Sequence, residues 1–360
     1  MNKRVLKNYI CLIYPIFAVV YLLGIFFGGI STGMVITFFL LAGAGAVCAL
    51  GLLTASFTED KVFGLYLLYN VLSGIWCVAF GIPVSVYVGE LSVTALPMML
   101  YYAGRGFGEE YASKYYRCFM LSALFLAAAA ALLYFFLPQL YPVFLYNIFG
   151  ENLSSLQVGF GERSESWIAA VNNMVNFWIG DGLGSHGHRS AGYQDYIVAD
   201  GGLVKLYSEM GLIGTSMIIF VLALVYIKAF RGRQATEQKE TASAGMKTAE
   251  AAAFRGMKAA ETEASKKKLT SVLPELLVIT SAVLVSAGFN LLETVLFTPL
   301  IFFALGRAVR KLNDDRAGEE YTGPFEDGRT PEAEDGDGGL EGAPAAWIYT
   351  DDRIKDGVKA

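Results

Sequence analysis

The sequence predicts an all-α integral membrane protein, a multi-pass helical bundle of about eight transmembrane segments with one large external loop. Hydrophobic residues make up 54% of the 360-residue chain and aromatic residues 14%, whereas soluble domains contain roughly 45–50% apolar residues. The mean hydropathy is +0.46 over the whole chain. The apolar residues also occur in long runs, which is typical of membrane-spanning helices.

The membrane spans are predicted from the length of these apolar runs. A helix needs about 20 apolar residues to cross the ~30 Å hydrocarbon core of a bilayer. The candidate segments are residues 9–28, 32–54, 62–83, 91–104, 117–137, 205–229, 271–289 and 293–306. The fourth and eighth are short, so each is either a full crossing or a broken or re-entrant helix buried among the others. The first lacks a small-residue cleavage site, which favours a retained span over a removed signal peptide.

Basic residues predict the orientation, because short loops rich in lysine and arginine stay in the cytoplasm. The lysines and arginine before the first span place the N terminus inside. With eight crossings, the basic residues of 105–117, of 231–268 and of the tail from 307 onward fall on the same side. The remaining large loop, residues 138–204, then faces outward. Both termini are expected in the cytoplasm.

These assignments divide the chain into six parts. The 231–269 insert repeats GMKTAEA as GMKAAET, and it is either a solvated helix or a docking element. The tail is acidic and poor in apolar residues, which predicts disorder. The parts are N-terminal transmembrane helices, 1–137; an extracytoplasmic loop with the candidate catalytic residues, 138–204; a transmembrane helix, 205–230; a cytoplasmic Ala/Glu/Lys-rich insert, 231–269; C-terminal transmembrane helices, 270–306; and a cytoplasmic tail, 307–360.

Composition also excludes some classes of function. The net charge is −5 and the one basic stretch lies between spans, so no nucleic-acid partner is expected, because binding to phosphate backbones needs a concentrated basic face. All four cysteines fall in or beside apolar runs without a CxxC pair. The cysteines therefore indicate neither a disulfide framework nor a cysteine metal site, and no cofactor is expected.

The first feature of the external loop is RSESWIAAVNNMVNFW, which begins at Arg163. Its large apolar residues recur at helical spacing and predict an amphipathic helix in the membrane interface. These residues are Trp167, Val171, Met174, Val175 and Trp178. Arg163, one turn before Trp167, would lie at the height of the lipid phosphates. It is either a phosphate-binding residue or a snorkelling arginine on an anchoring helix.

The second feature is GDGLGSHGHRS, residues 180–190. Glycines such as Gly182 and Gly184 permit tight turns and close approach to a ligand, and exposed N–H groups beside Ser185 would form an anion-binding nest. Next come two histidines and an arginine, namely His186, His188 and Arg189. Three alternatives remain open: a His-x-His metal pair, one histidine as base or phosphate donor, or a polar loop with exposed histidines.

The third feature, DYIVADGGLVKLYSEMGLIG, leads into the sixth segment. Asp200 is placed to cap the start of this helix. Lys205 and Glu209 are four residues apart on one helical face. Ionisable residues at membrane depth are costly unless they are paired or functional. The pair is therefore either part of a site or an interfacial salt bridge.

These motifs together resemble the O-antigen ligase and polymerase superfamily. The resemblance rests on Arg163 with Trp167, on GDGLGS and on EMGLIG, and it covers about 50 residues; the rest matches as a hydropathy pattern. Ligases of the family usually carry His-Asn where this chain has Asp200 and Gly201. The Asp-Gly form with GSHGH upstream favours the capsule or exopolysaccharide polymerase branch. About eight spans, against ten or more in the family, indicate a reduced N-terminal half.

The resemblance implies a glycosyltransferase of cell-surface polysaccharide biosynthesis in the bacterial plasma membrane. Its donor would be a polyprenyl-diphosphate-linked oligosaccharide and its acceptor a growing polysaccharide, in contact with membrane lipid, with a flippase and a chain-length regulator as partner proteins. Arginine forks suit diphosphate oxygens, and a base must take the proton of the acceptor hydroxyl. The expected catalytic residues are Arg163, Arg189, Asp200 and His188; the expected substrate-binding residues are Gly182, Gly184, Ser185, His186, Trp167, Lys205 and Glu209.

Three other readings stay open. A transporter or flippase for lipid-linked glycans also needs external arginines, although charges spread over several spans would be typical of it. A peptidoglycan polymerase of the shape, elongation, division and sporulation class shares a Glu-x-Gly-x-x-Gly helix, but its His/Thr/Asp run is absent here. A non-catalytic subunit of a polysaccharide assembly complex is the third.

Overall fold

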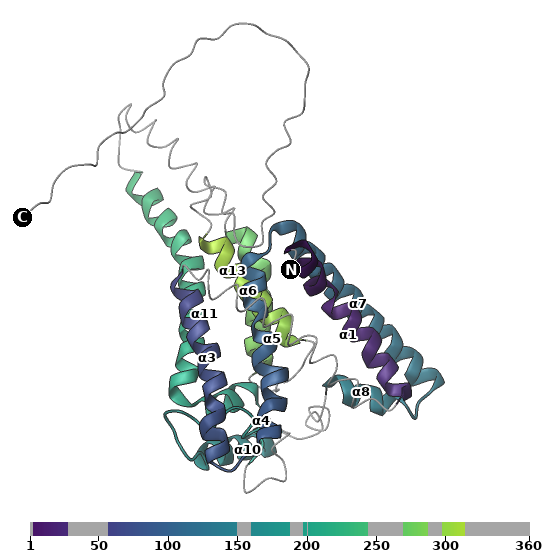
Figure 1. Cartoon of the computed structure of the whole chain (residues 1–360). Coiled ribbons are helices and arrows are strands. Elements are labelled where there is room, and N and C mark those ends of the chain that lie inside the picture. Colours follow the sequence, from purple (N-terminus) through teal and green to yellow (C-terminus); the bar gives the residue numbers. More distant parts are fainter. Residues whose placement is uncertain are drawn as a thin grey trace, which may run out of the picture. The chain divides into compact units, whose positions relative to one another are not determined.

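The computed structural model describes residues 3–27, 57–149, 160–187, 197–199, 201–243, 269–286 and 297–313, all within one compact unit, Met1–Asp327. Over these residues the chain is helical and contains no strand, which confirms the all-α prediction (Figure 1). By length and composition, five helices of this part are able to cross a membrane: Thr58–Ala79, Val84–Gly106, Glu109–Phe136, Gly202–Phe230 and Leu269–Ser286.

Four of the predicted segments correspond directly to such helices. They are 62–83 (α3, Thr58–Ala79), 117–137 (α7, Glu109–Phe136), 205–229 (within α11, Gly202–Ser243) and 271–289 (Leu269–Ser286). The first segment lies in α1, Lys3–Phe27, whose apolar part is Val5–Val20. The segment 32–54 lies outside the described residues, so the total of eight spans stays a prediction.

The fourth segment is longer than the sequence predicts. Val84–Gly106 is a helical stretch of 23 residues, so the prediction of a short segment at 91–104 is wrong. Its parts are α4 (Val84–Glu90), the π-helical turn η1 (Leu91–Ala95), α5 (Leu96–Met98) and α6 (Leu100–Gly106). The predicted segment leaves out Glu90, but the helical stretch includes it, and its carboxylate binds Lys205 of α11 at 2.5 Å.

The eighth segment, predicted at 293–306, corresponds to α13, Phe297–Asn313. Residues 293–296 lie outside the described residues, and the helix extends beyond 306 into the basic residues Arg307, Arg310 and Lys311. It has 17 residues, and most of its side chains are buried. Its packing partner is α6, and the two backbones come so close that a Cβ on Gly104 would overlap the carbonyl of Phe303. Close approach through small residues is typical of membrane helix pairs.

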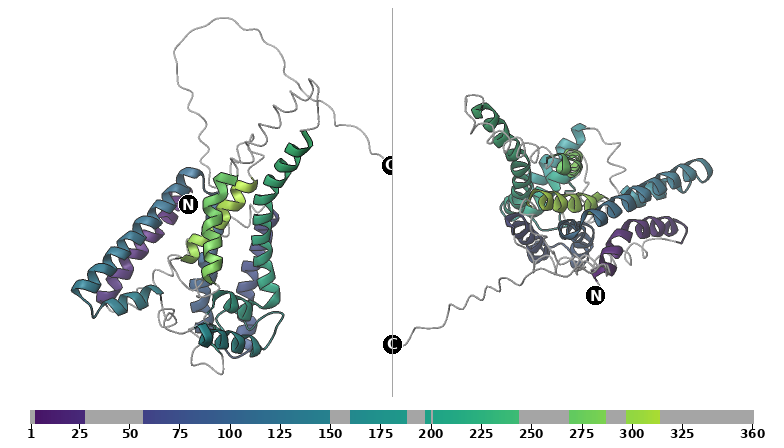
Figure 2. Two further views of the ribbon diagram at one scale, coloured as in Figure 1. Left: turned by 180° about the vertical axis from the view of Figure 1, so that it is seen from behind. Right: turned by 90° about the horizontal axis from the view of Figure 1, so that it is seen from above.

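Helix α7 illustrates how local sequence fixes an element. It starts after Gly108 with Glu109 and Glu110 in its first turn, where carboxylates favour the positive end of the helix dipole. It ends at Phe136, because the next residue, Leu137, precedes Pro138 and a residue before proline avoids the helical conformation. Helix α1 packs along α7 (Figure 2), and the short α8, Tyr141–Phe149, contacts both helices. Tyr115 of α7 donates its hydroxyl hydrogen to Tyr14 of α1 at 3.1 Å.

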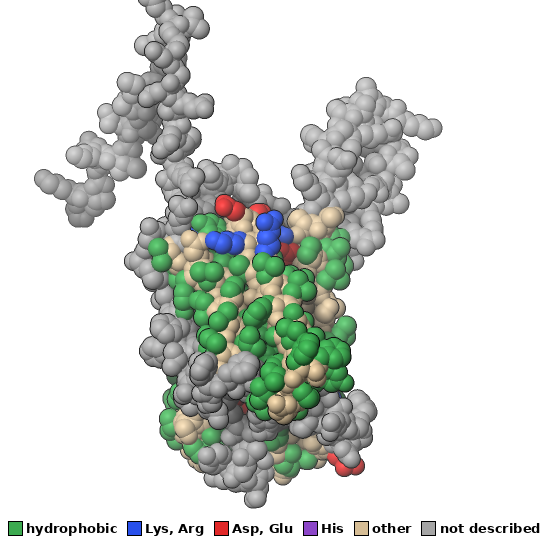
Figure 3. Space-filling model, turned by 90° about the vertical axis from the view of Figure 1, so that its right-hand side faces the viewer, with side chains coloured by type: hydrophobic (Ala, Val, Ile, Leu, Met, Phe, Trp, Pro, Cys, Tyr) green, Lys and Arg blue, Asp and Glu red, His purple; other side chains and the backbone are tan. Residues whose placement is uncertain are grey.

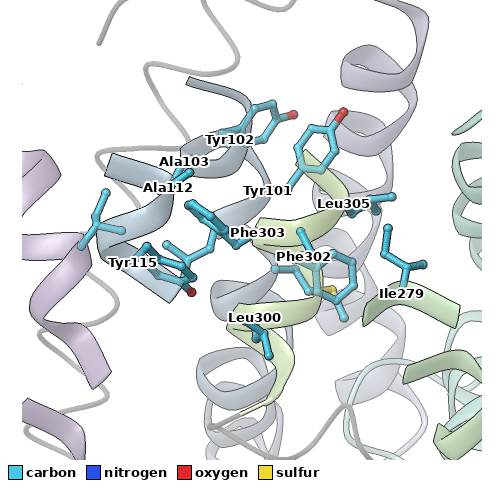
Figure 4. Close-up of a cluster of buried hydrophobic side chains, with 14 of the residues drawn as sticks. Tyr101, Tyr102, Ala103, Ala112, Tyr115, Ile279, Leu300, Phe302, Phe303 and Leu305 are labelled. Carbon is cyan, nitrogen blue, oxygen red and sulfur yellow. The ribbon is translucent and has the colours of Figure 1, made fainter. Parts of the chain in front are cut away.

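The core is rich in aromatic side chains. Phe303 of α13 stacks on Tyr115 of α7 with ring centroids 3.8 Å apart (Figure 4). Phe63 of α3 lies against Tyr101 of α6 at 4.2 Å. Such ring pairs contribute more than their buried area alone. They connect α3, α6, α7 and α13 into one apolar cluster.

The outer surface is also apolar. Figure 3 shows one face on which hydrophobic side chains form a broad band, with lysine and arginine side chains gathered towards one end. Leucine and phenylalanine side chains of α7 point outward, including Leu121, Leu124, Leu132 and Phe135. An apolar surface of this extent is unfavourable in water and suits contact with lipid. Length, composition and surface thus agree on a membrane protein with transmembrane helices.

Candidate functional site

The candidate site is built around a break in helix α11. At Gly211 the backbone leaves the helical conformation, with φ 62° and ψ −168°. The segment 177–182 occupies the break and takes over the backbone hydrogen bonds. The N–H groups of Asp181 and Gly182 donate to the carbonyls of Ser208 and Glu209, at 3.0 and 2.9 Å, and those of Leu212 and Ile213 donate to Phe177 and Trp178, both at 3.0 Å. Non-helical backbone at membrane depth is tolerated where such partners replace the lost ones.

Two glycines make this junction sterically feasible. Gly180 and Gly211 both have positive φ, at 72° and 62°. A Cβ on Gly211 would lie 2.5 Å from the carbonyl oxygen of Trp178, and one on Gly180 would overlap the carbonyl of Glu209. The hydroxyl of Tyr69, from α3, bridges the junction by donating to the carbonyls of Ile179 and Met210, at 2.8 and 3.2 Å. The break therefore depends on three separate stretches of chain.

The glycine-rich loop continues into the protein interior. The N–H of Leu183 donates to Ser73 Oγ of α3 at 3.1 Å, and Cys77 Sγ contacts the carbonyl of Leu183 at 3.4 Å. A Cβ on Gly184 would lie 3.1 Å from the Cβ of Glu90. Ser185 is fully buried, and its hydroxyl donates to the carbonyl of Gly182. This part of the predicted external loop is thus wedged between α3, α4 and α11.

Within this loop, Asp181 and His186 form a buried pair. His186 Nε2 lies 2.8 Å from Asp181 Oδ2, and His186 Nδ1 lies 2.8 Å from the carbonyl oxygen of Ile197. Because a carbonyl oxygen only accepts, Nδ1 carries a hydrogen, and Nε2 faces the carboxylate. The other carboxylate oxygen, Oδ1, accepts the N–H groups of Val175 and Asn176 at 2.8 and 3.2 Å. Asp181 therefore orients the imidazole and closes the turn before it.

Lys205 lies between two carboxylates. Its Nζ is 2.5 Å from Glu90 Oε1 and 3.6 Å from Glu209 Oε1. Thr94 Oγ1 donates to the same Glu90 oxygen at 2.6 Å, and the backbone N–H of His186 donates to Glu209 Oε1 at 3.2 Å. Glu90, Lys205 and Glu209 are at most 3% exposed. We call Glu90, Asp181, Lys205 and Glu209, together with the imidazole of His186, the charged cluster.

The structure brings six of the predicted site residues together. They are Gly182, Gly184, Ser185, His186, Lys205 and Glu209. The expected contact between Lys205 and Glu209 is present, although Lys205 binds Glu90 more closely. Among the described residues, no group of three or more His, Cys, Asp or Glu side chains is arranged to hold a metal ion. The other predicted catalytic residues of this region, His188, Arg189 and Asp200, lie outside the described residues.

The predicted amphipathic helix is shorter than expected. Helix α10 spans Phe160–Asn172, and the chain then turns. The extension to Trp178 is wrong, because Asp181 accepts the N–H groups at 175 and 176 while the side chain of Asn176 accepts those at 178 and 179. Trp178 remains on the surface and Arg163 is buried, at 61% and 7% exposed. Arg163 and Trp167 both lie on α10, which packs against α11.

The anion-binding nest is likewise corrected for part of the loop. The N–H groups of 180–183, 185 and 186 donate to oxygens of the protein itself, so they are committed to the fold and are not available to a phosphate. Glycine here serves the tight path of the loop. The sequence reasoning also missed Glu90 and Asp181. An acidic residue within an apolar run was the signal for Glu90, whereas Asp181 between two glycines looked like an ordinary turn residue.

Comparisons with known proteins give no match to a protein-family model, to a curated protein or to a solved structure. The class of the protein is therefore defined by the fold and the site alone. It is an all-α membrane protein in which a broken apolar helix and an inserted loop enclose a cluster of charged side chains.

The Asp181–His186 pair leads to a first prediction. We expect Asp181→Asn to lower stability by about 1–3 kcal/mol, because the N–H groups of Val175 and Asn176 now donate to a charged carboxylate oxygen, and the neutral amide is a weaker acceptor. Thermal unfolding of the purified protein measures this effect. Glu165→Gln, which replaces a carboxylate by an amide at an exposed position of α10, serves as a control that leaves stability nearly unchanged. Equal stability of Asp181→Asn and wild type would show that the pair contributes little.

Proposed function

We propose that the chain is a membrane glycosyltransferase that polymerises or ligates polyprenyl-diphosphate-linked oligosaccharide units on the outer face of a bacterial plasma membrane. The observation that carries the proposal is the charged cluster at the break of α11, with Glu90, Lys205 and Glu209 each at most 3% exposed. Buried charges at membrane depth are costly, and where they occur they mark substrate or ion pathways. The motif resemblance supplies the substrate class.

The proposed reaction needs few chemical groups. A hydroxyl oxygen of the acceptor sugar attacks the anomeric carbon of the donor, the bond from that carbon to the diphosphate oxygen breaks, and the hydroxyl proton passes to a base. Asp200 is the first candidate for the base and His188 the second. Diphosphate is a good leaving group, so cation pairing by Arg163 and Arg189 replaces a protonating acid. The charged cluster holds the loop 180–187, which lies in the sequence between Arg163 and the three other residues, His188, Arg189 and Asp200.

The proposal includes the finer topology. Eight spans with both termini in the cytoplasm place the loop 138–204 on the outer face, where lipid-linked donors are delivered. The growing polysaccharide, membrane lipid, a flippase and a chain-length regulator are the proposed partners. Arg163 lies on α10, which packs against α11, the helix that carries Lys205 and Glu209.

The decisive assay uses the full chain in lipid nanodiscs with polyprenyl-diphosphate-linked oligosaccharide extracted from the native host. We expect a ladder of longer glycans from the wild type. Arg163→Ala, Arg189→Ala and Asp200→Ala should each lower the rate by about a hundredfold or more, because each removes a group that acts in the transition state. Arg117→Ala, at an exposed arginine of α7, is the matched control and should leave the ladder intact.

A second candidate function is transport of the same lipid-linked glycan. The broken helix favours it, because transporters often bind their substrates at discontinuous membrane helices. Glu90 also adds a charge on another candidate span. Donor binding without a ladder, together with movement of labelled donor between leaflets, would favour transport. Well-folded wild-type protein that neither elongates nor binds the donor would contradict both functions.

A further inference from the structure

The ion pair between Glu90 and Lys205 connects two candidate membrane spans that are far apart in sequence. The two residues are separated by 115 positions, and the Nζ–Oε1 distance is 2.5 Å. Glu90 ends α4, directly before the π-helical turn η1, Leu91–Ala95. Such π-helical turns are rare and are frequent at functional sites. Thr94 lies in this turn, and its hydroxyl donates to Glu90 Oε1.

The contacts form a continuous path from this span to the glycine-rich loop. Glu90 binds Lys205, Lys205 lies 3.6 Å from Glu209 on the next turn of α11, and Glu209 accepts the N–H of His186. His186 then binds Asp181, and the backbone N–H of Asp181 donates to the carbonyl of Ser208, just before the break of α11. A carboxylate shared with an ammonium and an N–H is fixed more firmly than one held by a single bond.

We propose that Glu90 is a positioning residue of the site: it fixes Lys205 and Glu209 and thereby holds the loop 180–187 in the break of α11. Its effect on glycan transfer rests on the proposed function, whereas its effect on the loop does not. The span Val84–Gly106 is thus part of the site, and Thr94 of its π-helical turn donates to the Glu90 carboxylate. Glu90 acts through Lys205 and touches no reacting atom.

A purely structural role is the competing explanation, and the chain offers a matched control for it. Asp60 of α3 and Arg105 of α6 form a second buried carboxylate–cation pair, 3.2 Å apart. Arg105 lies 15 residues after Glu90 (105 − 90), which places it about 22 Å further along the same helical stretch. Asp60→Asn therefore removes the same kind of charge between membrane helices without touching the loop.

The experiment measures hydrogen–deuterium exchange and glycan elongation on the full chain in nanodiscs. We expect Glu90→Gln to speed amide exchange of residues 181–186 by about ten- to a hundredfold. The loss of a hydrogen bond to a charged group changes the equilibrium constant for loop opening by about this factor. The same variant should lower kcat for elongation more than it changes KM for the donor. Glu90→Asp, which keeps the charge, should restore part of both losses, and Asp60→Asn should leave the loop's exchange unchanged.

The outcomes separate this inference from the proposed function. Unchanged loop exchange in Glu90→Gln would overturn the inference, and so would equally faster exchange in Asp60→Asn. Faster exchange confined to the Glu90 variant supports it, even if the wild type gives no glycan ladder, in which case the proposed function alone fails. If Glu90→Gln does not fold, Glu90→Asp decides: its loop must exchange faster than the wild type, since the shorter side chain pulls Lys205 away.

Discussion

Replacing Gly211 by alanine is expected to destroy the site and most of the folded protein with it. The residue has φ 62° and ψ −168°, a conformation essentially restricted to glycine that costs about 1–3 kcal/mol for an L side chain. The added Cβ would also lie 2.5 and 2.6 Å from backbone atoms of Trp178 and Ile179. Backbone atoms cannot rotate away as side chains do, so the segment 177–182 must leave the break. We expect a loss of about 3 kcal/mol or more.

Yield of monodisperse protein and its thermal unfolding measure this loss. Gly108→Ala is the control, because a Cβ at Gly108 meets no atom within 4 Å. That variant should unfold near the wild-type temperature. If Gly211→Ala unfolds like Gly108→Ala, helix α11 is continuous and the description of the break is wrong.

Replacing Lys205 by methionine is the second change with a large expected effect. Methionine keeps much of the volume but removes the ammonium between Glu90 and Glu209, which are 0% and 2% exposed. Two carboxylates then face each other without the cation that binds both. Removing one partner of a buried ion pair costs about 3–5 kcal/mol, because the remaining charge keeps its desolvation penalty.

The double variant Lys205→Met/Glu90→Gln tests this explanation. Lys205→Met leaves the carboxylates of Glu90 and Glu209 without the ammonium. Glu90→Gln removes one of these two negative charges, so the double variant should be more stable than Lys205→Met alone. Thermal unfolding and the fraction of monodisperse protein report both effects. Strictly additive losses would mean that Lys205 stabilises the protein through packing and not through its charge.

Parts of the fold were predictable because they depend on local sequence. A run of apolar residues specifies a membrane helix wherever its partners lie, so α3, α7 and the apolar part of α11 follow from composition. Lys205 and Glu209 are four residues apart on one helix, and their contact is therefore local. The glycine-rich segment also predicts tight turns of the backbone, and the positive φ values at 180, 182 and 184 confirm them.

The remaining features depend on contacts between distant residues. The break in α11 exists because a loop from before the helix supplies the missing hydrogen bonds at Gly211. Helical periodicity predicted a longer α10. In the structure the N–H groups of 175 and 176 donate to the Asp181 carboxylate instead of continuing the helix, and the spacing of apolar residues does not reveal this. The predicted fourth segment omitted Glu90, whose partner Lys205 is 115 residues away. No local pattern contains this information.

The most direct measurement is photocrosslinking of a polyprenyl-diphosphate oligosaccharide that carries a photoreactive group beside the diphosphate. The probe is added to the full chain in nanodiscs, and the crosslinked peptides are identified by mass spectrometry. We expect crosslinks to α10, to the loop that begins at Gly180 and to the first turns of α11, and we expect unlabelled donor to compete them away. Crosslinks confined to the opposite end of the helices, around Asp60, Arg105 and Arg307, would contradict the site. A chain that gives no competed crosslink would contradict the substrate class as well.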